Sequence, residues 1–116
     1  MTKVFSLLGF AQRAGKLVSG EDGVQGALRK KNAYCLIIAE DSSENTLKKF
    51  MFLAEKYRVP VYIYGTKVQL GQAIGKSRRA LVLIQDPGFA QAIQKILADD
   101  NVSSRRIIRS DANEEN

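Results

Sequence analysis

The chain has 116 residues, 45% of them hydrophobic and 26% charged, a composition typical of one soluble globular domain. It has no histidine and a single cysteine, Cys35, which excludes an imidazole base, zinc sites that need histidine, and an intrachain disulfide. Eighteen Lys and Arg side chains against twelve Asp and Glu give a net charge of +6, which favours a polyanionic partner, either nucleic acid or an acidic membrane surface.

Apolar residues recur at helical spacing near the N-terminus, at Val4, Leu7, Leu8 and Ala11. Gly15 ends the helix that this pattern predicts. Residues 16–19 then form a very short extended stretch, and a second helix covers residues 21–31, beginning at Ser19 or Gly20. Residues 34–39 are short, apolar and bounded by polar residues, which predicts a buried strand.

The middle of the chain predicts a third helix followed by a second buried strand. Ser42 or Ser43 caps this helix, and Pro60 lies beyond its end. The apolar stripe of the helix consists of Leu47, Phe50, Met51 and Ala54. Residues 61–64 have the composition of a strand.

A short helical segment over residues 67–74 precedes the last predicted strand, residues 80–84. Asp86 and Pro87 then begin the final helix, because Asp caps a helix and Pro fits its first turn. The buried side of that helix is Phe89, Ile93, Ile96 and Leu97. Residues 99–116 are polar, with acidic side chains at both ends, and we expect this tail to be largely disordered.

Strand and helix therefore alternate four times behind one leading helix. This order predicts an α/β fold, a three-layer α/β/α sandwich around a central sheet of about four strands. Residues 1–98 contain no linker and no repeat, so we expect them to form a single domain. The pattern does not predict the order of the strands in the sheet.

The first candidate site is the glycine-rich turn that leads into the second helix. Its candidate residues are Gly20, Glu21, Asp22, Gly23 and Gly26. The spacing is not that of a phosphate-binding loop, and two carboxylates stand where a phosphate would lie. The bare glycine surface would instead admit a flat partner, and a carboxylate beside it can accept hydrogen bonds from guanine. The competing interpretation is structural, with Ser19 and Asp22 approximating a capping box.

The second candidate site is basic and lies before the last predicted strand. It comprises Lys67, Ile74, Lys76, Ser77, Arg78 and Arg79. Clustered cations in a loop can clamp phosphate oxygens, although a solvated basic loop is the commoner outcome. A further basic run, residues 29–31, includes Lys30 and falls where cations stabilise a helix C-terminus.

No pair of side chains proposes itself as general acid and base, so we expect a protein that is not an enzyme and has no cofactor and no metal. The longest apolar run, residues 34–39, is too short to span a bilayer, and the N-terminus lacks a signal-peptide pattern. We therefore expect a cytoplasmic protein without a membrane partner. Nothing in the sequence demands more than a monomer.

The order of four segments resembles the kink-turn RNA-binding ribosomal proteins, the large-subunit proteins of the "seven-A" and "thirty" types. These segments are residues 15–20, 36–41, 59–61 and 70–75, of which the last is the most specific. The chain looks like a short bacterial relative over about residues 3–98. The resemblance implies an α/β/α sandwich that binds sharply bent RNA with tandem sheared G·A pairs. Ribosomal RNA, a riboswitch and a small non-coding RNA can all contain such a bend.

Only some of the positions at which the family contacts RNA have matching residues in this sequence. Where the family uses an Asn-Glu pair and a Lys, this sequence has Asp22, Gly23 and Gly26. Glu21 or Asp22 would then supply a carboxylate, and Lys30 would replace the cation. The second loop matches better, since Lys67 and Arg78 fall at basic contact positions with Ser77 beside them. Family contacts elsewhere correspond to Ser43 and Leu47.

The sequence thus predicts an RNA-binding protein associated with the ribosome or with translation. Loss of base contacts with retention of phosphate contacts predicts weaker or less selective binding. The main alternative is a protein-interaction module on the same fold, whose glycine face receives a partner helix or loop. A nucleotide-binding enzyme is the remaining alternative, and the absent phosphate-loop lysine argues against it.

Overall fold

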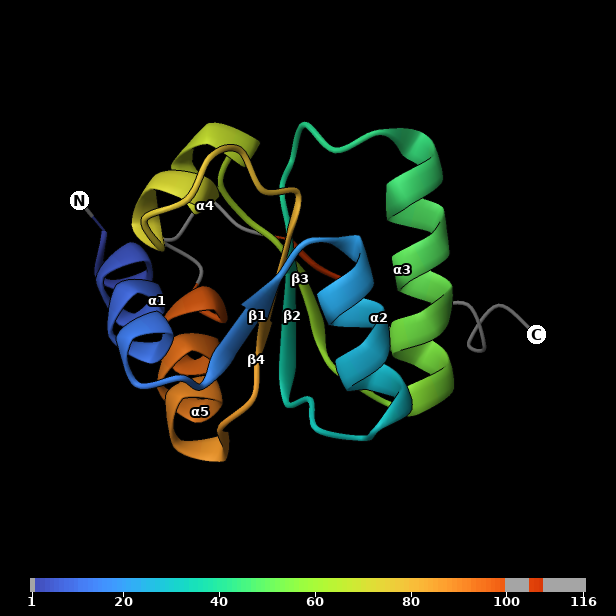
Figure 1. Ribbon diagram of the computed structural model, residues 1–116, viewed down its shortest axis with the longest axis horizontal. Coiled ribbons are helices and arrows are strands. Elements are labelled where there is room, and N and C mark those ends of the chain that lie inside the picture. Colours follow the sequence, from blue (N-terminus) through green and yellow to red (C-terminus); the bar gives the residue numbers. More distant parts are fainter. Residues whose placement is uncertain (1, 100–104, 108–116) are drawn as a thin grey trace.

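The computed structural model describes residues 2–99 and 105–107 (Figure 1). Helices and strands alternate after a leading helix, as the sequence predicts. In chain order the elements are α1 (Lys3–Arg13), β1 (Leu17–Ser19), α2 (Glu21–Arg29), β2 (Cys35–Ile38), α3 (Glu44–Tyr57), β3 (Val61–Ile63), α4 (Lys67–Ala73), β4 (Leu81–Ile84), α5 (Pro87–Leu97) and β5 (Arg105–Ile107).

The five strands form one mixed sheet in the order β1-β4-β2-β3-β5. Only β2 and β3 are parallel, with Leu36 opposite Val61, whereas β4 runs antiparallel to both β1 and β2. The antiparallel pairing brings the end of β1 beside the beginning of β4, where Ser19 lies opposite Val82. This register places the two candidate loops next to each other.

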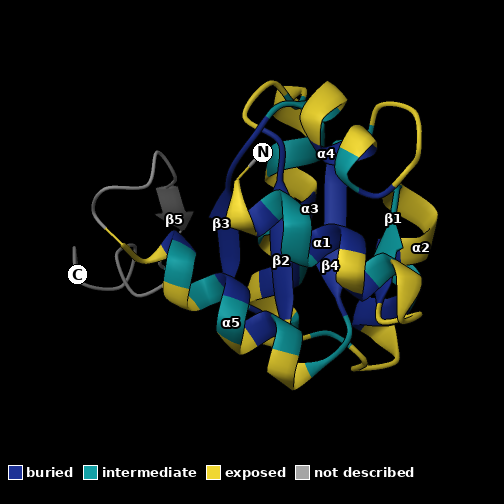
Figure 2. Ribbon diagram, turned by 90° about the vertical axis from the view of Figure 1, so that its left-hand side faces the viewer, coloured by how far each residue is buried: buried dark blue, intermediate teal, exposed yellow. Residues whose placement is uncertain are grey.

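Helices cover both faces of the sheet, which confirms the predicted three-layer sandwich. Helices α1, α4 and α5 lie on one face, and α2 and α3 lie on the other (Figure 1). Alternate residues of β2 point into the two cores. Cys35 and Ile37 belong to the core beneath α1, α4 and α5, and Leu36 and Ile38 belong to the core beneath α2 and α3. All four are buried, and the strands β2, β3 and β4 are dark from end to end in Figure 2.

Side-chain caps begin most of the helices. The Ser43 hydroxyl accepts a hydrogen bond from the Thr46 amide, and the Asp86 carboxylate accepts one from the Phe89 amide at 2.9 Å. Both caps were expected from local sequence. Helix α4 begins with a full capping box between Thr66 and Gln69.

Strand β5 was not predicted. It pairs antiparallel with β3, with Val61 opposite Ile107, and makes a fifth strand where about four were expected. It lies within residues 99–116, the segment predicted to be disordered. The remainder of that prediction concerns residues 100–104 and 108–116, which lie outside the described residues. Within the described part of the chain, no helix has both the length and the apolar character needed to cross a membrane.

Candidate nucleic-acid interface

The two loops singled out in the sequence form the walls of one groove. The Gly20 amide donates a hydrogen bond to the Leu81 carbonyl at 3.1 Å, which joins the start of α2 to the start of β4. The groove has a volume of about 350 Å³. It is lined by Ser19, Gly20, Glu21, Asp22, Gly23, Arg78, Arg79, Ala80 and Leu81.

The beginning of α2 differs from the capping box proposed for it. Gly20 is the N-cap, with φ of +84°, and makes no side-chain cap. A side chain at this position would be strained, because L-residues rarely adopt such φ values. The hydroxyl of Ser19 instead accepts a hydrogen bond from Arg79 Nε at 3.2 Å. The capping box between Ser19 and Asp22 was therefore a wrong prediction, and the first turn of α2 faces the groove without a side-chain cap.

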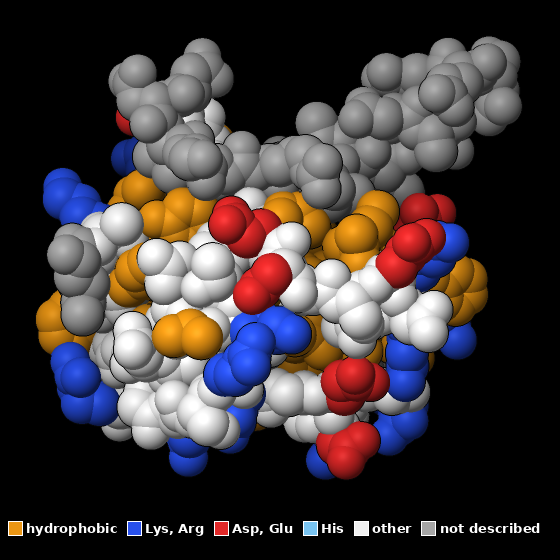
Figure 3. All heavy atoms as spheres, turned by 90° about the horizontal axis from the view of Figure 1, so that it is seen from above, with side chains coloured by type: hydrophobic (Ala, Val, Ile, Leu, Met, Phe, Trp, Pro, Cys, Tyr) orange, Lys and Arg blue, Asp and Glu red, His pale blue; other side chains and the backbone are white. Residues whose placement is uncertain are grey.

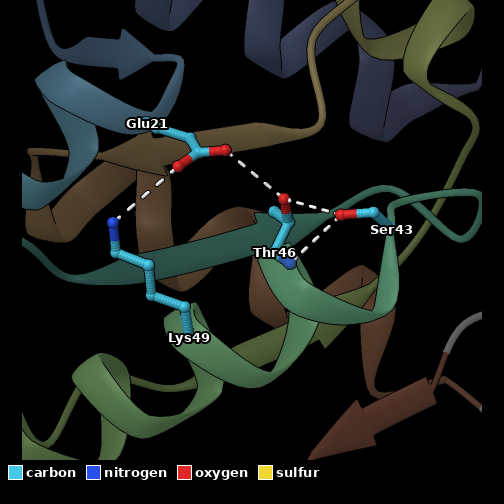
Figure 4. A network of polar contacts seen from close by, with 4 residues as sticks. All are labelled: Glu21, Ser43, Thr46 and Lys49. Atoms are coloured by element: carbon cyan, nitrogen blue, oxygen red, sulfur yellow. Dashed lines mark hydrogen bonds and ion pairs between the residues drawn. The ribbon is translucent and has the colours of Figure 1, made fainter.

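The two carboxylates of this turn have different surroundings. Glu21 accepts a hydrogen bond from Thr46 Oγ1 at 3.3 Å and lies 3.9 Å from Lys49 Nζ, so α3 holds it (Figure 4). The carboxylate of Asp22 has no hydrogen bond or ion pair with any residue that the structure describes. Asp22 is exposed on the groove wall. Of the two, Asp22 is the acceptor available to a ligand.

The two arginines of the basic wall also differ in their surroundings. Arg79 Nη1 donates to Ser77 Oγ and to the Arg78 carbonyl, both at 3.0 Å, in addition to the bond from Nε to Ser19. Arg79 therefore fastens the loop to the end of β1. Arg78 is exposed, and its guanidinium has no partner among the described residues. Arg78 is the side chain that this wall offers to an anion.

A close backbone approach fixes the shape of this loop. The Lys76 amide donates to the Gly71 carbonyl at 2.8 Å, and a Cβ built on Gly71 would lie 2.0 Å from the Ser77 carbonyl oxygen. Only glycine fits at that position. Helix α4 and the turn after it consequently pack directly on each other, and the turn carries Arg78 and Arg79 to the groove.

The other predicted contacts of the second loop fall in three places. Lys67 lies at the same end of the molecule, because its carbonyl accepts from the Arg79 amide at 3.0 Å and its amide donates to Asp41 Oδ1 at 2.9 Å. Lys76 is exposed on the turn. Ile74 is only 5% exposed and belongs to the core beneath α1, α4 and α5. Its side chain cannot reach a ligand, so this prediction was wrong.

The remaining candidates follow α2 away from the groove. Gly26 is half-buried within the helix, and Lys30 is the C-cap at the opposite end. Nine helical residues at 1.5 Å each separate the two ends of α2 by about 13 Å. The structure therefore does not bring Lys30 to the groove with Asp22 and Arg78. Leu47 is half-buried against the core between α2, α3 and the sheet, and Ser43 caps α3.

Sequence reasoning did not single out Thr46 and Lys49, the α3 residues that hold Glu21. Both lie on the predicted third helix, but no local pattern connects that helix to a loop 25 residues earlier. Viewed from above Figure 1, this end of the molecule shows Lys and Arg side chains lying between groups of Asp and Glu side chains (Figure 3). No group of three or more potential metal ligands occurs among the described residues.

A family profile matches most of the chain that forms this sandwich. The profile of the "Ribosomal protein L7Ae/L30e/S12e/Gadd45 family" matches residues 2–94. The chain belongs to this family, as the resemblance predicted. Membership agrees with the expectation that the chain is not an enzyme.

Individual relatives are similar to the chain over most of its length. It is 41% identical over 93 residues to "RNA-binding protein YlxQ" of Bacillus subtilis (strain 168), covering 80% of this chain and 93% of the relative. The YlxQ protein of Enterococcus faecium is 35% identical, covering 82% of this chain and 91% of the relative. "Large ribosomal subunit protein eL30" of Branchiostoma belcheri is 30% identical, covering 86% and 90%.

The fold is shared with a solved structure described as a protein with unknown function from Bacillus halodurans C. The TM-score is 0.82 at 32% sequence identity, and the match covers 85% of this chain and all of that one.

Proposed function

We propose that the groove between α2 and the turn before β4 binds structured RNA, in particular a kink-turn or a related sharp bend with sheared G·A pairs. The observation that carries the proposal is the presence of Asp22 and Arg78 on the same groove, each without a protein partner among the described residues. The family and the relatives named as RNA-binding support it.

The two side chains match the two kinds of group that bent RNA presents. A carboxylate such as that of Asp22 accepts hydrogen bonds from the N–H groups of a guanine whose edge is exposed by non-Watson–Crick pairing. A guanidinium such as that of Arg78 binds phosphate oxygens. The glycines at 20 and 23 leave the intervening surface low, so a base can approach the helix backbone.

From the residues of this groove we expect only modest selectivity for bent RNA over other RNA. Gly23 and Gly26 stand where the resembling ribosomal proteins carry base-contacting side chains, and Lys30 lies too far away to replace them. Asp22 then carries most of the base discrimination, while Arg78, Lys67 and Lys76 contribute attraction to the backbone. The eL30 relative makes ribosomal RNA a candidate ligand. We further propose that the protein acts in the cytoplasm as a monomer.

A titration tests the proposal. A kink-turn RNA is compared with a length-matched duplex without the G·A pairs, at ~50 and ~200 mM salt, because specific contacts survive salt better than phosphate contacts alone. We expect a preference for the bent RNA that persists at the higher salt. Asp22→Ala removes the acceptor and should reduce that preference, whereas Arg78→Ala should weaken the binding of both RNAs. Lys95→Ala, an exposed cation on α5, is the matched control.

Two results would contradict the proposal. Equal affinities that collapse together at ~200 mM salt would indicate a basic surface without a reading groove. No binding of either RNA would favour the protein-interaction module as the function of this fold.

A further inference from the structure

Little of the protein's surplus positive charge lies at the groove. Residues 2–99 contain fifteen Lys and Arg and eight Asp and Glu, a surplus of seven. At the groove end the cations are Lys67, Lys76, Arg78, Arg79 and Lys49, which pairs with Glu21, and the anions are Glu21, Asp22, Glu40 and Asp41. This end therefore has a surplus of one positive charge, so the groove alone does not account for the surplus of seven.

The surplus is concentrated at the opposite end of the sheet. There β1, β2 and β3 begin and β4 ends, and hydrogen bonds join the segments. The Gln85 amide donates to the Lys16 carbonyl at 2.8 Å, and Gln85 Nε2 donates to the Asn32 carbonyl at 3.4 Å. The Leu36 amide donates to the Pro60 carbonyl at 2.9 Å, which brings the segment after α3 beside the segment after α2.

Six exposed cations lie on these joined segments, and we call this surface the basic end. They are Lys16, Arg29, Lys30, Lys31, Lys56 and Arg58. Figure 1 shows α2 and α3 ending side by side at the bottom of the view. Among the residues that the structure describes, the acidic ones nearby are Glu55 and Asp86, and the carboxylate of Asp86 caps α5. None of the six cations forms an ion pair with another described residue.

Helix dipoles explain only part of this surface. They favour cations in a last turn, such as Arg29 and Lys56. Lys31 and Arg58, however, have φ of 59° and 60°, in the left-handed region where glycine or asparagine is favoured. Both positions just beyond the helices therefore carry a long cation at a conformational cost. A structural role alone does not require this, because glycine would end both helices more readily.

We propose that the basic end is a second RNA-contacting surface, which binds the phosphate backbone of a duplex segment extending beyond the part held in the groove. This inference rests on the proposed function, but it concerns different residues. Helix α3 has fourteen residues and is about 21 Å long at 1.5 Å per residue, so an RNA confined to the groove does not reach the basic end. Only an RNA with an extended stem contacts both surfaces.

The test uses the full chain and two RNAs, a minimal kink-turn and the same kink-turn with one stem lengthened by about 20 base pairs. The variant carries Lys30→Gln, Lys31→Asn and Arg58→Asn, because asparagine tolerates the left-handed conformation. The control removes the same net charge elsewhere with Lys3→Gln, Lys48→Gln and Lys95→Gln, three exposed positions. Affinities are measured from ~50 to ~200 mM salt. Matched unfolding curves verify that both proteins fold.

We expect the variant to lose about tenfold in affinity for the extended RNA and the slope of log affinity against log salt to fall by about 2 to 3, since each duplex phosphate contact contributes about 0.9. The minimal RNA should bind as it does to the wild type. The extended RNA should also protect Lys30 and Lys31 of the wild type from an amine-reactive reagent.

Equal behaviour of the variant and its control on the extended RNA would overturn the inference. So would a loss of the same size on the minimal RNA, because the basic end would then not depend on the longer stem. Failure of the proposed function would give a different result, because the wild type would then bind bent and straight RNA equally well. The loss of affinity caused by the substitutions at the basic end could still be measured on a straight duplex.

Discussion

Gly71 determines where the basic wall of the groove lies, because the backbone of the following turn occupies the space of a side chain. Gly71→Ala would place a Cβ 2.0 Å from the Ser77 carbonyl oxygen, so either α4 or the turn must move. We expect a loss of about 2 kcal/mol in the free energy of unfolding and weaker RNA binding. Chemical denaturation and RNA titration check both effects.

Gly26→Ala is the matched control, since a Cβ at Gly26 meets no atom within 4 Å. This substitution should stabilise α2 by about 0.5–1 kcal/mol, because alanine favours a helix interior. Similar destabilisation by both substitutions would contradict the role assigned to the close approach at Gly71.

The two arginines of the turn should separate stability from binding. Arg79→Lys keeps the charge but loses the forked contacts to Ser19 and Ser77, so we expect about 1 kcal/mol of destabilisation. Arg78→Ala should leave stability within about 0.5 kcal/mol and reduce RNA affinity instead. Thermal unfolding beside RNA titration distinguishes them. A reversed pattern would mean that Arg79 is the ligand-binding side chain.

At the scale of the elements, β5 covers one edge of the sheet. A chain ending at Asp99 lacks this strand and leaves β3 as the edge. We expect the free energy of unfolding to fall by about 1–3 kcal/mol through the lost ladder hydrogen bonds. Hydrogen exchange should accelerate at β3 amides while β2, paired on both sides, keeps its protection. Unchanged exchange in β3 would show that the pairing with β5 contributes little.

Local sequence was sufficient for most elements, because their signals are short-range. Ser43 and Asp86 cap helices with bonds that span three residues, and β2 is an uninterrupted apolar run. Strand β5 gave no such signal, since a three-residue strand in a polar segment depends on the free edge of β3. The strand order likewise depends on the antiparallel insertion of β4 between β1 and β2. That pairing involves segments far apart in the sequence, so local patterns do not predict it.

Each of the two loops that form the groove was recognisable in the sequence, but their proximity in space was not. Ser19 looked like a cap because its hydroxyl precedes a helix with acidic residues. Its partner is Arg79, 60 residues away, and local spacing contains no information about that bond. Ile74 was misplaced for a related reason, since it lies within a basic segment but faces the core.

For the molecule as a whole, the sheet separates two cores that should respond independently. Ile93 belongs to the core beneath α1, α4 and α5, and Ile38 to the core beneath α2 and α3. Ile93→Val and Ile38→Val should each cost about 0.5–1.5 kcal/mol. The double variant should show the sum within about 0.5 kcal/mol in chemical denaturation. A larger coupling energy would mean that the sheet transmits packing changes between the layers.

The pairing of β1 with β4 also sets the moment at which the groove can exist during synthesis. One wall is complete once residues 19–23 have been made, but the other wall and the strand that aligns it end only at Ile84. Before β4 is made, the Ser19 hydroxyl lacks its hydrogen-bond donor, the Arg79 guanidinium, and the Gly20 amide lacks its acceptor, the Leu81 carbonyl. A nascent chain therefore acquires the groove only after most of the sandwich has been synthesised.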